Sequence, residues 1–308
     1  MTGKNSRMRT LVAPLLAALI WGMAFVAQKM NRMGAFAFNA SRSLIACLFL
    51  LPVIMLIRRC GVRRALTEKT PKQTKMLWLG GMLCGLTLSL ASYFQQHGMD
   101  CGTDAGKAGF ITALYMILVP VFSLLLGKRC RWTVYLAAGL AVAALYLLCV
   151  KEGMGVETSD LFVLCSSFLF CAQILVIDRF APETDCLKLS FVQFLTSFIV
   201  SSAGSVLMGE PFAADMLRES LWPLLYLGVL SSGVAYTLQM IAQQGGNPTV
   251  VSILMSMESV FSLLFGFLIL KEEILPRQLF GSLLMLCAVL LTQLPEKRTR
   301  PEETQEKV

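Results

Sequence analysis

The chain has 308 residues, of which 56% are hydrophobic and only 15% are charged, and its mean hydropathy is +0.67. A soluble domain carries about a quarter charged residues, so this chain lacks the polar side chains needed to cover an aqueous surface. The formal net charge of +8 does not indicate nucleic-acid binding, because the basic residues lie mostly in short segments between apolar runs. We therefore expect a protein whose main partner is the lipid bilayer.

Ten apolar segments have the length expected of membrane-spanning helices. The first leads directly into further segments of this kind, so we interpret it as a helix and not as a cleavable signal peptide. In chain order the segments are Leu11–Gln28, Phe36–Ile57, Met76–Gly98, Ala105–Leu126, Trp132–Val150, Leu161–Ile177, Leu187–Met208, Leu221–Gln243, Pro248–Leu270 and Pro276–Leu294. The sequence thus predicts an all-α membrane protein with ten transmembrane helices and a polar tail over residues 295–308.

The two halves of the chain resemble each other. A shift of 144 residues, without a gap, places residues 91–148 over residues 235–292, with Gln95 on Gln239 and Gly102 on Gly246. Glu258 falls on Leu114, so the halves share a shape and differ in chemistry. We predict one five-helix repeat over residues 11–150 and a second over 160–294. Because each contains an odd number of helices, the second must be inverted in the membrane, as in many transporters.

The basic residues predict the orientation. If the N-terminus is cytoplasmic, 19 of the 27 lysines and arginines lie on the inner side, seven lie on the outer side, and Arg42 lies within a helix. Cytoplasmic segments of membrane proteins are enriched in such residues. Both termini are therefore expected in the cytoplasm.

Glu258 is the only carboxylate deep within a predicted span, about ten residues or ~15 Å from the start of its helix. Asn247 and Pro248 are expected to cap and begin that helix. A charge at this depth costs several kcal/mol unless it faces a wet cavity or a partner. We therefore expect Glu258 to accept a proton or to bind a substrate amine; the alternative is a purely structural role.

Other polar side chains also lie within predicted spans. Arg42 is about six residues, or ~9 Å, from the outer end of its helix. It either extends to the lipid headgroups or faces a cavity, where it binds an anionic group or pairs with an acid. Buried amides need hydrogen-bond partners, which a solute or a neighbouring helix provides. The amide candidates for a binding site are Gln95, Gln173, Gln193 and Gln239.

Trp21 lies midway along the first predicted helix, whereas the other tryptophans lie at helix ends, as interfacial anchors do. We expect Trp21, Tyr115 and Tyr236 to form an aromatic wall of the site; for Trp21 the alternative is packing or contact with lipid.

Pro120 lies inside the predicted helix Ala105–Leu126 and is expected to bend it.

Motifs for other chemistry are weak. The sequence GTDAGKA, residues 102–108, is one residue shorter than a phosphate-binding loop and lacks the Ser or Thr after Lys107. His97 is the only histidine, and its proximity to Cys101 is weak evidence for a nucleophile. The sequence has no cluster of metal ligands. We therefore expect no enzyme activity, no cofactor and no metal.

Several segments are similar to the drug/metabolite transporter superfamily, in particular its EamA-type members. They are LIWGMAFVAQK, TDAGKAGFITALYMILVPVFSLLLG and NPTVVSILMSMESVFSLLFGFLILKEEILPRQLFGSLLMLCAVLL. The resemblance extends from about Leu11 to Leu294. It implies ten helices in two EamA-like repeats and export of small metabolites, amino acids or toxic compounds, driven by an ion gradient or by the gradient of the substrate.

The sequence thus predicts a secondary transporter in the cell membrane, as a monomer or a homodimer, with a solute site between the halves. The different class to be weighed against it is a membrane-embedded sensor or scaffold that binds a ligand without moving it. Flux into sealed vesicles separates the two, because a scaffold produces none.

The orientation can be tested by cysteine labelling in a variant that lacks the ten native cysteines. Single cysteines in residues 58–75 and in the tail are expected to react only with reagents that reach the cytoplasmic face. A tail labelled from outside would contradict both the orientation and the inverted repeat.

Overall fold

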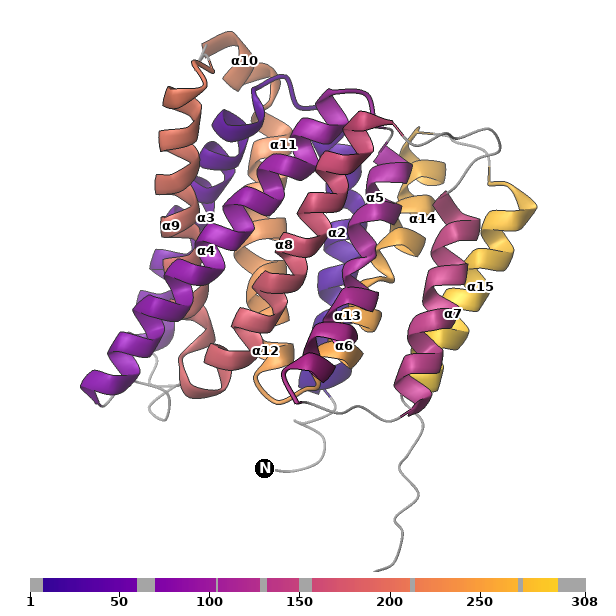
Figure 1. Cartoon of the computed structure of the whole chain (residues 1–308). Helices are drawn as coiled ribbons and strands as arrows, with labels where there is room; N and C mark the ends of the chain where they lie inside the picture. Colours follow the sequence, from indigo (N-terminus) through magenta and orange to yellow (C-terminus); the bar gives the residue numbers. More distant parts are fainter. Residues whose placement is uncertain are drawn as a thin grey trace, which may run out of the picture.

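The computed structural model describes residues 8–59, 70–103, 105–127, 132–149, 157–210, 214–270 and 274–292. Within these ranges the chain is helical apart from short turns, and it contains no β-strand. The helices lie side by side in one bundle (Figure 1). The tail predicted over residues 295–308 lies outside the described residues, as does most of the basic segment 58–75.

The N-terminal half begins with a short π-helical turn, η1 (Met8–Val12), which continues into α2 (Ala13–Lys29). It then contains α3 (Ala35–Arg59), α4 (Pro71–Asp100), α5 (Ala105–Ala113), α6 (Tyr115–Leu125) and α7 (Trp132–Cys149).

The C-terminal half contains more and shorter elements. They are α8 (Thr158–Phe180), η3 (Ala181–Glu183), α9 (Cys186–Leu207), α10 (Ala214–Glu219), α11 (Leu221–Leu225), η4 (Tyr226–Ala235), α12 (Tyr236–Gln243), α13 (Pro248–Met255), α14 (Glu258–Leu270) and α15 (Pro276–Thr292).

Seven helical stretches are long and apolar enough to cross a membrane. They are Thr10–Gln28, Ala35–Arg59, Pro71–Asp100, Thr158–Glu183, Cys186–Leu207, Leu221–Gln243 and Pro248–Ile269. Shorter apolar helices occupy Ile111–Leu125, Trp132–Leu147 and Pro276–Thr292. An all-helical, multi-pass membrane protein is therefore confirmed, whereas the count of ten spans stays a prediction.

Side chains cap the first turns of two helices, α13 and α9. The side chain of Asn247 accepts a hydrogen bond from the Thr249 amide at 2.9 Å, with Pro248 as the first helical residue, which confirms the predicted cap. Asp185 caps α9 in the same way. Such caps satisfy amide groups that have no partner within the helix.

The predicted helix Pro248–Leu270 corresponds to one helical stretch, Pro248–Ile269, but this stretch is not regular throughout. The regular pattern stops between Met255 and Glu258, where the Met257 amide bonds to the carbonyl of Leu254 at 3.3 Å, three residues back. The Ser256 hydroxyl contributes, because it donates to the carbonyl of Ile253 at 2.7 Å and competes with the regular ladder.

The helix predicted over Ala105–Leu126 is interrupted as well, but not where we expected. The break lies at Leu114, between α5 and α6, whereas Pro120 lies inside α6. The helices resume at Tyr115 and at Glu258, which are 143 residues apart, within one residue of the 144-residue spacing of the sequence repeat. The same spacing separates the first residues of α7 and α15, Trp132 and Pro276.

The predicted helix Leu221–Gln243 is not uniformly α-helical, because η4 is a π-helical segment ten residues long. Two glycines bring it close to α3: a Cβ atom at Gly228 would lie 2.6 Å from Cβ of Ile45, and one at Gly233 would lie 2.6 Å from the ring of Phe49. π-Helical segments are rare and frequently occur at functional sites.

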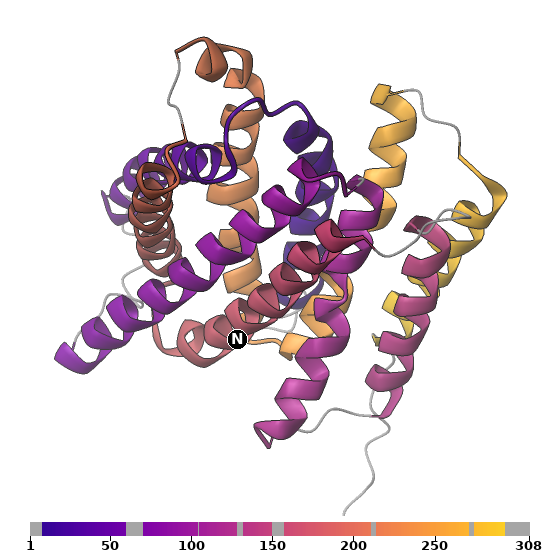
Figure 2. The same ribbon diagram turned by 45° about the horizontal axis from the view of Figure 1, so that its top comes forward.

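The main packing contacts join the two halves of the chain. Helix α3 packs on α9, α4 on α8 and α9, α7 on α15, and α2 on α14 and η4. Both views show α7 and α15 side by side at one edge of the bundle, with α3, α4 and α9 at the opposite edge (Figures 1 and 2). The halves therefore form one bundle and not two separate cores.

Gly85 allows α4 to pack closely on α9. A Cβ atom there would overlap with the carbonyl oxygen of Gln193 and lie 2.5 Å from Cβ of Thr196. Small residues commonly permit such close approach between membrane helices.

We expect Gly85→Val to destabilise the fold by about 1–3 kcal/mol, because neither backbone can yield without disturbing its helix. Thermal unfolding of the detergent-solubilised protein measures the effect. Gly139→Val in α7 is the matched control, since no atom lies within 4 Å of a Cβ at that exposed position. Equal melting temperatures for the two variants would contradict this packing.

Candidate functional site

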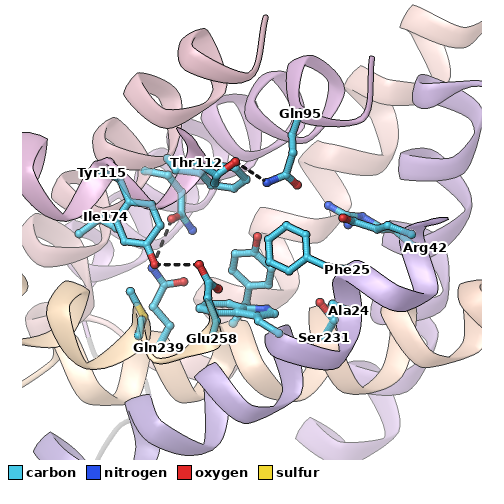
Figure 3. A pocket seen from close by; sticks show the side chains of 16 residues that line it. Ala24, Phe25, Arg42, Gln95, Thr112, Tyr115, Ile174, Ser231, Gln239 and Glu258 are labelled. Atoms are coloured by element: carbon cyan, nitrogen blue, oxygen red, sulfur yellow. Dashed lines mark hydrogen bonds between the residues drawn. The ribbon is translucent and has the colours of Figure 1, made fainter. Parts of the chain in front are cut away.

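A pocket of about 570 Å³ lies between the two halves of the chain (Figure 3). Residues from α2, α3, α4, α5 and α6 form it together with residues from α8, η4, α12, α13 and α14. The lining residues are Trp21, Ala24, Phe25, Gln28, Arg42, Gln95, Thr112, Tyr115, Phe170, Gln173, Ile174, Ser231, Tyr236, Gln239, Met255 and Glu258.

Eight of the nine predicted site residues line this pocket: Trp21, Arg42, Gln95, Tyr115, Gln173, Tyr236, Gln239 and Glu258. Gln193 does not. It is fully buried behind Gln173, whose amide nitrogen donates to Gln193 Oε1 at 3.1 Å. Gln193 therefore contacts a lining residue but not the pocket.

The two helix interruptions converge at one end of the pocket. Tyr115 is the first residue of α6 and Glu258 the first residue of α14. The Tyr115 hydroxyl donates to Glu258 Oε1 at 3.4 Å (Figure 3). A carboxylate at the first position of a helix also lies near the positive end of the helix dipole. These features stabilise Glu258 without a cationic side chain.

Arg42 lies at the opposite end of the pocket in Figure 3 and is 5% exposed. Its Nε donates to Asn39 Oδ1 at 2.9 Å and its Nη2 donates to Ser92 Oγ at 2.6 Å. Among the ion pairs of the described residues, none joins Arg42 to a carboxylate, and Glu258 in particular is not its partner. The pocket thus contains a carboxyl group, that of Glu258, and a guanidinium group, that of Arg42, which do not form an ion pair with each other.

Amide side chains connect the walls between these two ends. Gln239 Nε2 donates to Gln173 Oε1 at 3.3 Å, and Gln95 Nε2 donates to Thr112 Oγ1 at 3.0 Å. Within the described part of the chain, the buried Oε1 of Gln239 has no hydrogen-bond partner. Because a buried polar atom without a partner is costly, a ligand that donates a hydrogen bond would be stabilised there.

Aromatic rings form much of the remaining wall. Trp21 and Tyr236 are edge to face with ring centroids 4.9 Å apart, and Phe194 packs behind Tyr236 at 5.6 Å. Such pairs hold large rings in a fixed orientation.

Some lining residues were missed although the sequence contained a signal. Trp21, Ala24, Phe25 and Gln28 follow the i, i+3, i+4, i+7 spacing of one helix face. Extending the pattern from Trp21 would have found Phe25 and Gln28. Phe170 and Gln173 share a face of α8 in the same way. Thr112 and Ser231 had no such signal, because they depend on the α5–α6 break and on η4.

The weaker motifs lie away from the pocket. His97 is partly buried at the end of α4, where it stacks on Tyr93 with ring centroids 5.4 Å apart, and it does not line the pocket. The side chain of Lys107 lies outside what the structure describes. Among the described residues, no group of three or more His, Cys, Asp and Glu side chains is placed to hold a metal ion.

The fold and the pocket define a multi-pass helical membrane protein with a central polar site. The sequence profile of the EamA-like transporter family matches residues 8–150 and, a second time, residues 158–294. The chain therefore belongs to the EamA-like transporter family.

Individual relatives agree with this family. A protein of Archaeoglobus fulgidus described as an uncharacterized transporter is 29% identical over 288 residues, which are 91% of this chain and 84% of its own. The uncharacterized transporter YoaV of Bacillus subtilis is 21% identical over 292 residues, covering 92% and 96%. A crystal structure of another protein superposes with a TM-score of 0.74 and 17% identity over 92% of this chain and 96% of its own; this likeness shows the fold alone.

The position of η4 at the pocket can be tested with adjacent serines. In a variant without native cysteines, Ser231→Cys is expected to react with a small water-soluble methanethiosulfonate, because Ser231 lines the pocket. Ser232→Cys is the control, since both serines are buried but only Ser231 lines the pocket. Mass spectrometry measures the modified fraction, and equal rates at the two positions would contradict the π-helical register.

Proposed function

We propose that this protein is a secondary active transporter that exports small metabolites, amino acids or toxic compounds across the cytoplasmic membrane. The observation that carries the proposal is the pocket itself. Both halves of a membrane-embedded bundle build it, and it contains an acid and an arginine that are not paired with each other. Ionisable groups are costly inside a membrane and commonly mark substrate or ion pathways.

We further propose ten membrane spans arranged as two inverted repeats over residues 11–150 and 160–294. The helix restarts at Tyr115 and Glu258 are 143 residues apart and the starts of α7 and α15 are 144 apart, which supports this arrangement. The contacts support it too, because α3–α9 and α7–α15 each pair an element with its expected counterpart. With an even number of spans both termini lie on the same side, and the distribution of lysines and arginines favours the cytoplasm.

Alternating access follows from such a fold. The pocket lies where the halves meet, so a rocking of one half against the other would expose it first to one side and then to the other. The interruptions at Leu114 and Ser256–Met257 are places where helices of each half can bend without breaking a regular ladder.

The two ends of the pocket complement a substrate with charges of opposite sign. Arg42 would bind an anionic group, and Glu258 would bind an amine or a proton. The amides of Gln95, Gln173 and Gln239 would supply hydrogen bonds, and Trp21, Tyr115 and Tyr236 would cover apolar parts. A small zwitterion such as an amino acid satisfies these requirements.

Proton coupling would use Glu258. Burial disfavours the ionised form of a carboxyl group, so a proton can be held in one facing state and released where water enters. Proton and substrate amine would then compete for one carboxylate, which links their movements in opposite directions.

Glu258→Gln is expected to abolish uphill transport driven by a pH gradient while leaving some binding or downhill exchange. Glutamine keeps the shape and hydrogen bonding of glutamate but cannot titrate. The substrate is first identified as the metabolite that accumulates outside cells overproducing the protein. Its flux is then measured in proteoliposomes with and without a pH gradient.

Glu183→Gln is the control, because it removes the same charge at an exposed position where Glu183 pairs with Arg179. Uphill transport by Glu258→Gln at the wild-type rate would exclude the proton role. No flux at all with the wild-type protein would contradict transport and favour a ligand-binding sensor or scaffold.

A further inference from the structure

A line of hydrogen bonds runs from Arg42 away from the pocket and into the contact between the halves. Arg42 Nε donates to Asn39 Oδ1 at 2.9 Å, and Asn39 Nδ2 donates to Ser201 Oγ at 2.6 Å. Ser201 shares a further hydrogen bond of 2.7 Å with Ser89. We call these hydrogen bonds, from Arg42 through Asn39 and Ser201 to Ser89, the relay. Arg42 and Asn39 belong to α3, Ser201 to α9 and Ser89 to α4, so the relay connects three helices from both halves.

The relay is fully enclosed by protein. Asn39 is 2% exposed, and Ser89 and Ser201 are not exposed at all. In such surroundings a polar atom without a partner is destabilising by about 1–3 kcal/mol. The Asn39 amide therefore has one favourable orientation, with its oxygen toward Arg42 and its nitrogen toward Ser201.

This orientation determines which part of Arg42 faces the pocket. A guanidinium group has five N–H donors in a rigid plane. Asn39 and Ser92 take one each, so in the described part of the chain three donors have no protein partner. Because the group is planar, fixing Nε and one N–H of Nη2 also fixes the direction of the remaining three. A carboxylate or phosphate needs two such parallel donors for bidentate binding.

We propose that Asn39 is a positioning residue which, held by Ser201 of α9, orients Arg42 for bidentate binding of an anionic group in the pocket. The selectivity of the pocket for anions then depends on a hydrogen bond between the two halves. A movement of α3 relative to α9 would break the hydrogen bond between Asn39 and Ser201 and weaken the binding of the anion by Arg42. This inference rests on the proposed function, since it concerns the same site.

The test compares benzoate with benzamide, two probes of nearly equal shape of which only benzoate is an anion. Binding to the full-length protein in lipid nanodiscs is measured by calorimetry at neutral pH. We expect the wild-type protein to prefer benzoate. Asn39→Leu should reduce this preference about tenfold and Ser201→Ala roughly threefold, mainly through weaker binding of benzoate, because a misdirected guanidinium loses one charged hydrogen bond.

Ser197→Ala is the matched control. Ser197 is as buried as Ser201, lies one turn earlier in α9 and bonds to Ser43 of α3 at 3.1 Å, but it is not a hydrogen-bond partner of Asn39 or Arg42. A merely structural effect of removing a hydroxyl from this interface would therefore be the same in both serine variants. We expect Ser197→Ala to keep the wild-type preference for benzoate.

Three results would overturn the inference. If Asn39→Leu and Ser201→Ala keep the wild-type preference, the relay does not position Arg42, although Arg42 can still bind anions as proposed. If Ser197→Ala lowers the preference as much as Ser201→Ala, the effect belongs to the interface and not to the relay. If the wild-type protein binds benzoate no better than benzamide, the anion-binding role of Arg42 fails together with the inference.

Discussion

The low polarity of the membrane interior is the constraint on which the site depends. Inside a bilayer every charged or polar group must find its partners within the protein or in an enclosed wet cavity. Glu258 does so through Tyr115, and Arg42 does so through Asn39 and Ser92. Because each group has neutral partners, neither requires the other, and both stay available to a third molecule between them.

The interrupted helices determine where polar side chains meet inside the membrane. At both interruptions the backbone amides keep carbonyl partners three residues back, as Leu114 does with Ile111 and Met257 with Leu254, so each helix can change direction without exposing unsatisfied groups. The breaks at Leu114 and Ser256–Met257 place Tyr115 and Glu258 at new helix starts facing one pocket. Helices that line the pocket also pack across the halves, α4 on α8 and α2 on α14, so a shift of one half relative to the other would move the pocket walls.

Much of the fold and of the site could be predicted from the sequence, and the exceptions have physical causes. Hydropathy and spacing identified the membrane class, the helix order and the polar candidates, because polar residues are too costly to be common in membrane helices. Gln193 met the same criterion but faces Gln173 and not the pocket, a direction that polarity alone does not determine. The helix breaks and η4 were missed because they depend on packing and side-chain bonds, such as that of Ser256, which hydropathy does not report.

The central claim is that Glu258 is a buried carboxyl group that gains and loses a proton while it lies in the pocket. Dicyclohexylcarbodiimide tests it without knowledge of the substrate, because this apolar reagent reacts with protonated carboxyl groups in membrane interiors. Peptide mass spectrometry of the labelled protein in lipid nanodiscs, across a series of pH values, gives the extent of reaction at Glu258. The account predicts labelling that falls as the pH rises. Absence of labelling at every pH, or labelling that does not change with pH, would contradict it.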